Sequence, residues 1–455
     1  MAFLTFADVQ SHLDTLGLFH MDMGLHRMDD ALRALGLSRP PFAVAHVVGT
    51  NGKGSTATFL ASIAKAHGVR CGLYTSPHFV TPRERIRING QMLPEALWPQ
   101  LCQRVHDVAP QLTYFELLTV LAVLAFAGGS PVSPTTNDRD TTGTTAGTAT
   151  ATTITPAPPL LEPVQLAVME AGLGGRHDAT TALAADVVCY TPIGMDHERV
   201  LGNTLSAIAT DKAGAIRHRV PAITGHQDPE ALRALHEAAA QHNAPLHTAA
   251  AIATLPPDAR LGLAGPHQQQ NALLALAAWT TLATANGWPI DDAATRRGLA
   301  AAFIPGRLQT IPASPQHGHP QLLLDGAHNA HGLAALQRAL AAQSVHPRAV
   351  IFSCLADKNL AAIAPHLLAL AGKAPLIIPT IADNERAASG HDLAAHLGPQ
   401  AQAVPRLTDA LQIVASQAAT THPDTPVLLC GSLYLLAEFF TLRPDCLTSP
   451  TDSTP

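Results

Sequence analysis

A glycine-rich segment near the N-terminus contains the residues needed to hold a nucleoside triphosphate. It reads Gly49-Thr50-Asn51-Gly52-Lys53-Gly54-Ser55 and follows an apolar run over residues 43–48. The run predicts a buried strand and the residues after the glycines predict a helix, whose free backbone N–H groups favour an anion. Lys53 adds a cation, and Ser55 or Thr56 adds a hydroxyl for a phosphate or its magnesium ion. We therefore predict a phosphate-binding loop.

The spacing of this loop departs from the standard G-x-x-x-x-G-K-[ST] pattern. Val47 stands where the first glycine is required, and Gly54 follows Lys53 in place of Ser or Thr. A glycine-rich turn with a surface lysine is the alternative interpretation. The strand before the loop and the helix after it favour nucleotide binding.

Three polar residues are expected beside this loop, each following a predicted buried strand. In a parallel sheet the carboxyl ends of the strands share one edge, where ligands bind. Oxygen and nitrogen ligands, completed by phosphate oxygens and water, suit magnesium. Each residue alone has a structural explanation, but together with the loop they predict a metal site. The residues are Ser76, Glu170 and His197, after strands predicted over 71–75, 164–169 and 186–191.

Two further sites carry charged residues, and each has a structural explanation. Asp211 and Lys212 lie near the end of a helix predicted over 204–217 and are explained most simply as a solvated pair. Arg307 follows Pro305-Gly306, which ends a helix and marks a hinge. It could form a salt bridge between domains, or it could reach a γ-phosphate when the domains close. For Arg307, the residues alone leave both interpretations open.

The elements that must position these groups alternate between strand and helix. Helices are expected within residues 1–42, around 94–107 and 115–127, over 228–242, and from 265 onward. From about residue 309 the alternation restarts, with strands over 321–325, 348–352, 374–378 and 426–430. We predict an α/β fold with a phosphate-loop ATPase domain on a mostly parallel sheet at 1–307 and a smaller α/β domain at 308–442.

Two segments have too few apolar residues to offset the entropy of ordering. Residues 128–163 are rich in Thr, Ala, Gly and Pro and predict a disordered surface insertion. Residues 443–455 predict a disordered tail.

Composition limits the class of protein. A chain of 455 residues predicts two or three domains, and its net charge of −6 without basic runs argues against nucleic acid as a partner. The six cysteines are scattered, which fits a reducing cytoplasm and neither zinc nor disulfides. No signal-peptide pattern and no apolar run of about 18–20 residues is present. We expect a soluble cytoplasmic protein with no membrane partner.

The chain resembles the folylpolyglutamate synthases and dihydrofolate synthases of the Mur ligase superfamily. The matching motifs occur in family order over about residues 45–435. They are Gly49 to Ser55, Thr75-Ser-Pro-His78, Glu170-Ala-Gly-Leu-Gly-Gly-Arg176, Asp196-His197 with Leu201-Gly202, Asp211-Lys-Ala-Gly214, His267-Gln268 with Asn271, Pro305-Gly-Arg307, Asp325-Gly-Ala-His-Asn329 and Gly431-Ser-Leu-Tyr434.

The resemblance implies an ATP-binding central domain and a Rossmann-like C-terminal domain with the active site between them. The loop from Thr50 to Ser55 would hold the ATP phosphates, and Asn271, Arg307 and Asp325 would also contact ATP. Ser76, Glu170 and His197 would bind magnesium, with two ions expected in all. Lys212 matches a family lysine that is carbamylated and binds a further metal ion, which replaces the solvated-pair interpretation. Catalytic roles would fall to Lys53, Lys212, Arg307 and His328.

The resemblance also assigns the substrate sites. Thr113, Tyr114, Phe115, Glu116 and His177 match positions that line the pterin pocket of bifunctional bacterial members, and His328 and Ser432 lie where the incoming glutamate is expected. The chain departs from the family at three positions, which affects the expected substrate preference. His177 stands where Leu or Tyr is usual, Thr181 where Asn is usual, and Asp211 where Glu is usual.

The implied activity is ATP-dependent addition of L-glutamate to dihydropteroate and to tetrahydrofolate and its polyglutamates, through an acyl phosphate. One alternative is a folylpolyglutamate synthase only. A muramyl-type ligase is disfavoured by Pro77-His78 and by the Gly431-Ser-Leu-Tyr434 end. A nucleotide-dependent binding module without catalysis is disfavoured by the intact Lys53, Glu170, His197 and Arg307. A monomer is expected, as is typical of the family.

Overall fold

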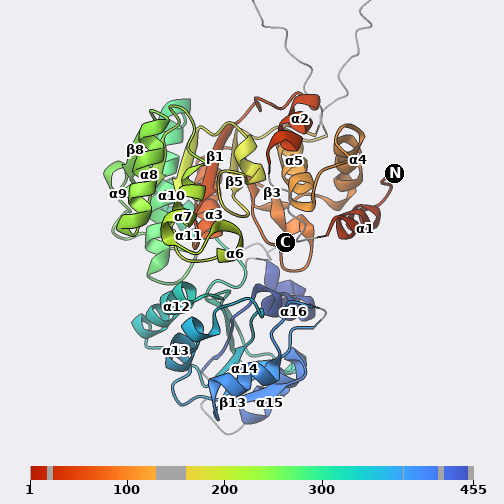
Figure 1. Cartoon of the computed structure of the whole chain (residues 1–455), viewed down its shortest axis with the longest axis vertical. Coiled ribbons are helices and arrows are strands. Elements are labelled where there is room, and N and C mark those ends of the chain that lie inside the picture. Colours follow the sequence, from red (N-terminus) through yellow and green to blue (C-terminus); the bar gives the residue numbers. More distant parts are fainter. Residues whose placement is uncertain (1, 18–23, 130–159, 383, 419–424, 449–455) are drawn as a thin grey trace, which may run out of the picture.

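The computed structural model describes residues 2–17, 24–129, 160–382, 384–418 and 425–448. Most of the disordered insertion predicted at 128–163 and the end of the predicted tail lie outside the described residues. The described chain forms two lobes, each built on its own sheet (Figure 1).

The larger lobe has an eight-stranded sheet in the order β4-β3-β2-β5-β1-β6-β7-β8. All neighbours are parallel except β2 with β3 and β3 with β4, which are antiparallel. The strands are β1 Ala43–Val48, β2 Cys71–Tyr74, β3 Ile86–Ile88, β4 Gln91–Met92, β5 Leu166–Glu170, β6 Val187–Tyr190, β7 Ala222–Thr224 and β8 Leu246–Thr248.

Helices cover both faces of this sheet because its central strands are apolar on both sides. In β1, Val44 and Val48 pack into one hydrophobic cluster, whereas Ala45 and Val47 pack into the other, as the two-residue period of a strand requires. The helices are α1 Phe6–Leu16, α2 His26–Ala34, α3 Lys53–Ala66, α4 Trp98–Val108, α5 Tyr114–Phe126, α6 Glu198–Leu201, α7 Leu205–Ala213, α8 Pro229–Gln241, α9 Ala249–Ile252, α10 His267–Asn286 and α11 Asp292–Ala301.

The smaller lobe has a six-stranded sheet in the order β13-β12-β11-β14-β10-β9, with only β9 antiparallel to its neighbour. Its strands are β9 Gln309–Ile311, β10 Leu322–Leu324, β11 Ala349–Phe352, β12 Leu376–Pro379, β13 Ala401–Val404 and β14 Val427–Cys430. Its helices are α12 Ala330–Ala342, α13 Leu360–Ala371, α14 Gly390–Leu397, α15 Leu407–Ala418 and α16 Leu433–Leu442.

The α/β fold predicted from the sequence is confirmed, and β1 has the predicted bounds. The connection between α11 of the large lobe and β9 of the small lobe spans residues 302–308, so the boundary predicted at 307/308 falls inside it and stays a prediction. The prediction of a disordered tail from residue 443 is wrong for its first part. A helical turn at Pro444–Leu447 is formed because Cys446 and Leu447 are buried against the small-lobe core, and Cys446 O accepts a hydrogen bond from Gln309.

Candidate active site

The predicted phosphate loop connects β1 to α3. Gly52 closes it with a φ of 88°, and a Cβ atom added there would lie 2.4 Å from Asn271 Oδ1. Only glycine satisfies both constraints. Lys53 Nζ donates to the carbonyl of Thr50 at 3.1 Å, and the Thr50 hydroxyl exchanges two hydrogen bonds with Gly194. These hydrogen bonds hold the loop in its conformation without a ligand. Asn271, which is predicted to contact the nucleotide, lies against the loop.

The first turn of α3 buries two hydroxyls beneath this loop. Ser55 and Thr56 are 3% and 0% exposed, and Thr56 Oγ1 has no hydrogen-bond partner among the described residues. Buried polar atoms are nearly always paired. An unpaired hydroxyl at a helix start therefore fits a site that is completed by a ligand.

Glu170 lies at the end of its strand, β5, as the sequence predicted, and β5 runs between β2 and β1 in the sheet. It is buried, and its Oε2 accepts a hydrogen bond from the backbone N–H of Ser76 at 3.0 Å. A Cβ added to Gly54 would lie 3.4 Å from the same carboxylate, so the phosphate loop contacts it. Burial raises the pKa of Glu170, and Lys53 opposes that rise. A buried carboxylate with one hydrogen-bond donor fits a bound cation.

His197, the third predicted metal ligand, is exposed at the start of α6 with a φ of 54°. It is close enough to Lys53 and Lys212 to be affected by their charges, but no hydrogen bond joins it to Ser76 or Glu170. In the part of the chain that the structure describes, no three His, Cys, Asp or Glu side chains form a metal cluster. The donors present fit magnesium, which takes few protein ligands and completes its shell with phosphate and water.

Lys212 is buried in the large lobe, so the solvated-pair interpretation of this residue is wrong. It is 3% exposed, and its Nζ donates to the carbonyl of Gly49 at 2.9 Å. A Cβ added to Gly175 would lie 2.4 Å from the carbonyl oxygen of Lys212. Glycine at this position therefore lets the loop over residues 171–176, here called the glycine loop, pack against the lysine. Burial, with a contribution from Lys53, lowers the pKa of Lys212 to about 7.

The small lobe presents its predicted residues at the ends of β10 and β14. Asp325 is buried and accepts from the N–H groups of Leu308 and Ala327, while burial raises its pKa against the influence of Arg307. Burial also lowers the pKa of His328 to about 4, so its imidazole is neutral at pH 7. Ser432 caps α16 by accepting from the N–H of Tyr434.

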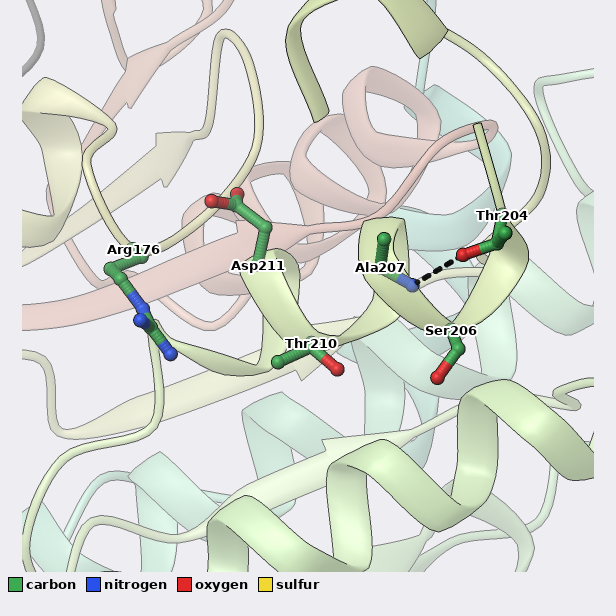
Figure 2. A pocket seen from close by; sticks show the side chains of 6 residues that line it. All are labelled: Arg176, Thr204, Ser206, Ala207, Thr210 and Asp211. Carbon is green, nitrogen blue, oxygen red and sulfur yellow. Dashed lines mark hydrogen bonds between the residues drawn. The ribbon is translucent and has the colours of Figure 1, made fainter. Parts of the chain in front are cut away.

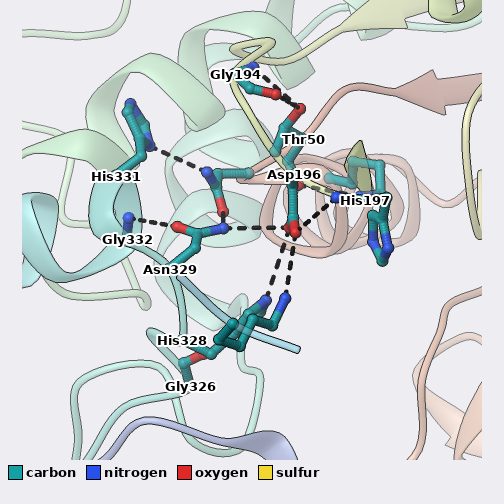
Figure 3. A network of polar contacts seen from close by, with 12 residues as sticks. Thr50, Gly194, Asp196, His197, Gly326, His328, Asn329, His331 and Gly332 are labelled. Atoms are coloured by element: carbon teal, nitrogen blue, oxygen red, sulfur yellow. Dashed lines mark hydrogen bonds and ion pairs between the residues drawn. The ribbon is translucent and has the colours of Figure 1, made fainter. Parts of the chain in front are cut away.

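A polar network joins the two lobes above the phosphate loop. Lys358 Nζ lies 3.2 Å from Asp196 Oδ1, and Asn329 Nδ2 donates to Asp196 Oδ2 at 3.2 Å. Asn51 of the phosphate loop lies 3.0 Å from His331 Nδ1. Figure 3 shows Asp196 between the large lobe and the side chains of Asn329 and His328. The loop and the small-lobe strand ends therefore face each other.

Comparisons with known proteins agree with this arrangement. Residues 306–433 match the model of the Mur ligase glutamate ligase domain. The dihydrofolate synthase/folylpolyglutamate synthase of Bacillus subtilis is 32% identical over 385 residues, which cover 78% of this chain and 81% of that protein. The chain belongs to the dihydrofolate synthase/folylpolyglutamate synthase family.

Solved structures of family members match nearly the whole chain. Escherichia coli FolC in complex with DHPP and ADP is 27% identical, with a TM-score of 0.78 and coverage of 97% of this chain and 98% of that one. The Yersinia pestis bifunctional enzyme complexed with AMPPNP and Mn ion is 26% identical, with a TM-score of 0.77 and coverage of 97% and 98%. This member of the dihydrofolate synthase/folylpolyglutamate synthase family is therefore an ATP-dependent acid–amino-acid ligase.

The residues predicted to line the pterin pocket of this ligase start helix α5. Phe115 lies against Gly172, where a Cβ would come within 2.5 Å of its ring, and its ring is 5.8 Å from that of Tyr74. The Glu116 carboxylate is paired with the buried Arg27 at 2.8 Å and accepts from the N–H of Thr113. That carboxylate therefore has a structural role, and its contact with substrate stays a prediction. His177 is exposed.

A cavity of about 510 Å³ lies beside the glycine loop of the ligase, and its lining is outside the predicted set of site residues. Its wall is formed mainly by α7 and by Thr204, which caps that helix (Figure 2). Arg176 from the glycine loop completes the lining.

Sequence reasoning missed two lobe-joining residues of the ligase, Lys358 and His331. Lys358 follows the predicted strand that became β11, so the strand-end rule applied to the small lobe would have found it. His331 lies in the first turn of α12, and nothing in its local pattern separates it from the other histidines.

None of the described helices is long and apolar enough to cross a membrane. All six cysteines are free and buried, and the cytoplasmic location stays a prediction.

Proposed function

We propose that this ligase adds L-glutamate to dihydropteroate, forming dihydrofolate, and to tetrahydrofolate and its polyglutamates, extending their tails. The observation that carries the proposal is the contact of Asn51 with His331 at 3.0 Å. It brings the phosphate loop against the small-lobe residues expected to hold glutamate. ATP, acid and amino acid can then meet in one interlobe site.

The proposed reaction has two steps because a carboxylate is a poor electrophile. A carboxylate oxygen attacks the γ-phosphorus of ATP and ADP leaves, giving an acyl phosphate. The neutral amine of glutamate then attacks the carbonyl carbon, and phosphate leaves as the amide forms and the amine loses a proton. Lys53 and Arg307 stabilise the negative charge on the transferred phosphoryl group. His328, whose pKa lies near 4, is neutral and can orient the incoming amine by a hydrogen bond, while the proton of the amine leaves to the departing phosphate or to water.

Ser76, Glu170 and His197 would hold magnesium, which supplies charge neutralisation at the phosphates. Closure of the two lobes, with Pro305-Gly306 as hinge, excludes water that would hydrolyse the acyl phosphate.

We also propose that Lys212 is carbamylated. Its Nζ is buried with a pKa of about 7, so at slightly alkaline pH the neutral amine can attack carbon dioxide and release a proton. The resulting carbamate would be an oxygen ligand for a second metal ion. Carbon-13 NMR of protein equilibrated with labelled bicarbonate should show a carbamate signal that Lys212→Met lacks.

The test of the proposed function is incorporation of labelled glutamate by the purified chain with ATP and magnesium. Dihydropteroate and tetrahydrofolate are offered separately, with Lys53→Ala as the inactive control. Incorporation with both acids supports the bifunctional ligase, incorporation with tetrahydrofolate alone restricts it to polyglutamylation, and incorporation with neither refutes the proposal. Light scattering during chromatography checks the proposed monomer.

A further inference from the structure

Arg85 is a buried cation without an acidic partner in the described part of the chain. It ends the helical turn Pro82–Arg85 and is 3% exposed. Its Nε donates to Nδ1 of His78 at 2.8 Å, but no carboxylate forms an ion pair with it. The neighbouring Glu84 directs its two oxygens to the N–H groups of Phe79, Val80 and Thr81 and forms no ion pair with Arg85. A buried guanidinium is almost always paired, so a ligand is the expected partner.

Arg85 lies next to a residue of the predicted pterin pocket. Its Cζ lies 5.5 Å from the centre of the Tyr114 ring, at the start of α5. Its charge acts on Glu170 in the large lobe and on Tyr434 in the small lobe. The guanidinium therefore lies beside the Tyr114 ring, within electrostatic range of residues in both lobes.

We propose that Arg85 binds the carboxylate of the pterin acid that receives the phosphoryl group. The planar guanidinium can hold a carboxylate through two parallel hydrogen bonds, which fixes the orientation of the attacking oxygen. The ATP phosphates already have Lys53 and the loop N–H groups, and the buried Arg27 near the start of α5 is paired with Glu116. This inference rests on the proposed function, because it assigns the acid substrate of that same site.

The test compares binding of two ligands that differ only in this group: dihydropteroate and its carboxamide. Binding is measured in the presence of ADP for the wild type, Arg85→Gln and Arg85→Lys. The wild type should prefer the acid by about 10- to 100-fold, the range expected for charge-assisted hydrogen bonds. Arg85→Gln should bind both ligands about equally, and Arg85→Lys should keep part of the preference. Affinity for ADP should stay unchanged in all three.

Arg87 supplies the matched control. It lies two residues further along in β3 and donates to the carbonyls of Glu84 and Gly90. Arg87→Gln makes the same chemical change outside the proposed site and should keep the wild-type preference for the acid.

Three results would overturn the inference: equal loss of acid and carboxamide binding in Arg85→Gln, a fall in ADP affinity in place of acid affinity, or a retained preference for the acid. The first would make Arg85 a pocket support, and the second would make it a phosphate ligand. Because binding needs no turnover, failure of glutamate incorporation would refute the proposed function without deciding the role of Arg85.

Discussion

Lys358 of the small lobe places its ammonium group 3.2 Å from a carboxylate oxygen of Asp196 in the large lobe. Both side chains are mostly buried, at 17% and 12% exposure. Burial by itself would raise the pKa of Asp196, yet His197, Lys358 and His328 hold it below its usual value. The carboxylate is thus ionised near neutral pH, and it links the segment beside the metal site to the segment that would hold glutamate.

The bridge formed by the ion pair of Asp196 and Lys358 predicts energetic coupling between the two lobes. A double-mutant cycle of Asp196→Asn and Lys358→Met, measured on kcat/KM for glutamate, should give a coupling of roughly 1–2 kcal/mol. The exposed pair Arg296 and Asp258 lies within the large lobe and serves as a control, with coupling below roughly 0.5 kcal/mol. Additive effects at Asp196 and Lys358 would show that the bridge does not act in catalysis.

Two buried glutamates should respond in opposite ways to the same substitution. Glu170→Gln removes an unpaired buried charge, so magnesium-supported ATP turnover should fall at least about 100-fold while stability is kept or raised. Glu116→Gln breaks the buried pair with Arg27 and should lower the free energy of unfolding by about 2–3 kcal/mol. Urea unfolding and ATP turnover separate the two. Magnesium-supported ATP turnover equal to that of the wild type in Glu170→Gln, at the same magnesium concentration, would count against the metal site.

Two glycines with positive φ test the shape of the phosphate loop. Gly52→Ala and Gly68→Ala should each cost about 1 kcal/mol of stability, because both have left-handed backbones. Only at Gly52 would the added methyl group strike Asn271, since nothing lies within 4 Å at Gly68. Affinity for ADP, measured by calorimetry, should therefore fall more than about tenfold only in Gly52→Ala. Equal affinity for ADP in both variants would show that Asn271 and the loop do not bind the nucleotide.

Lys212 predicts a pH dependence of stability. Its pKa is about 7 in the folded chain against an ordinary value of 10.5. Between these values the unfolded chain binds the extra proton, so the stability contribution of Lys212 rises as pH increases from about 7 and levels off above about 10.5. The difference in unfolding free energy between the wild type and Lys212→Met, measured from pH 6 to 9 without bicarbonate, should follow this rise. A flat difference would mean that Lys212 titrates as an exposed lysine.

The sequence predicted the elements whose burial pattern is local. The strand at Ala43–Val48 is a continuous apolar run ended by glycine, and its prediction needed no tertiary information. The hairpin β3–β4 was missed because Ile86–Ile88 has only three residues, of which the middle one is Arg87. Strand β13 was missed because Ala401–Val404 is a half-buried edge of the sheet.

The candidate site likewise has residues whose place the sequence predicted and residues whose place only the fold shows. The strand-end rule predicted that Ser76 and Glu170 would meet, because parallel strands bring their ends to one edge. It could not predict that Lys212 is buried, which depends on the close approach of Gly175 from a distant loop. Arg85 stands among Arg83, Glu84 and Arg87, a pattern typical of a solvated surface, and only the fold shows that it lacks a partner.

Transfer of a carboxylate oxygen to phosphate tests the central claim most directly. Dihydropteroate labelled with oxygen-18 in its carboxylate is turned over once with ATP, magnesium and glutamate, and the released phosphate is analysed by mass spectrometry. The acyl-phosphate mechanism predicts one labelled oxygen in each phosphate, derived from the acid. Amide formation with unlabelled phosphate, the lost oxygen-18 appearing in AMP or in water, would contradict it.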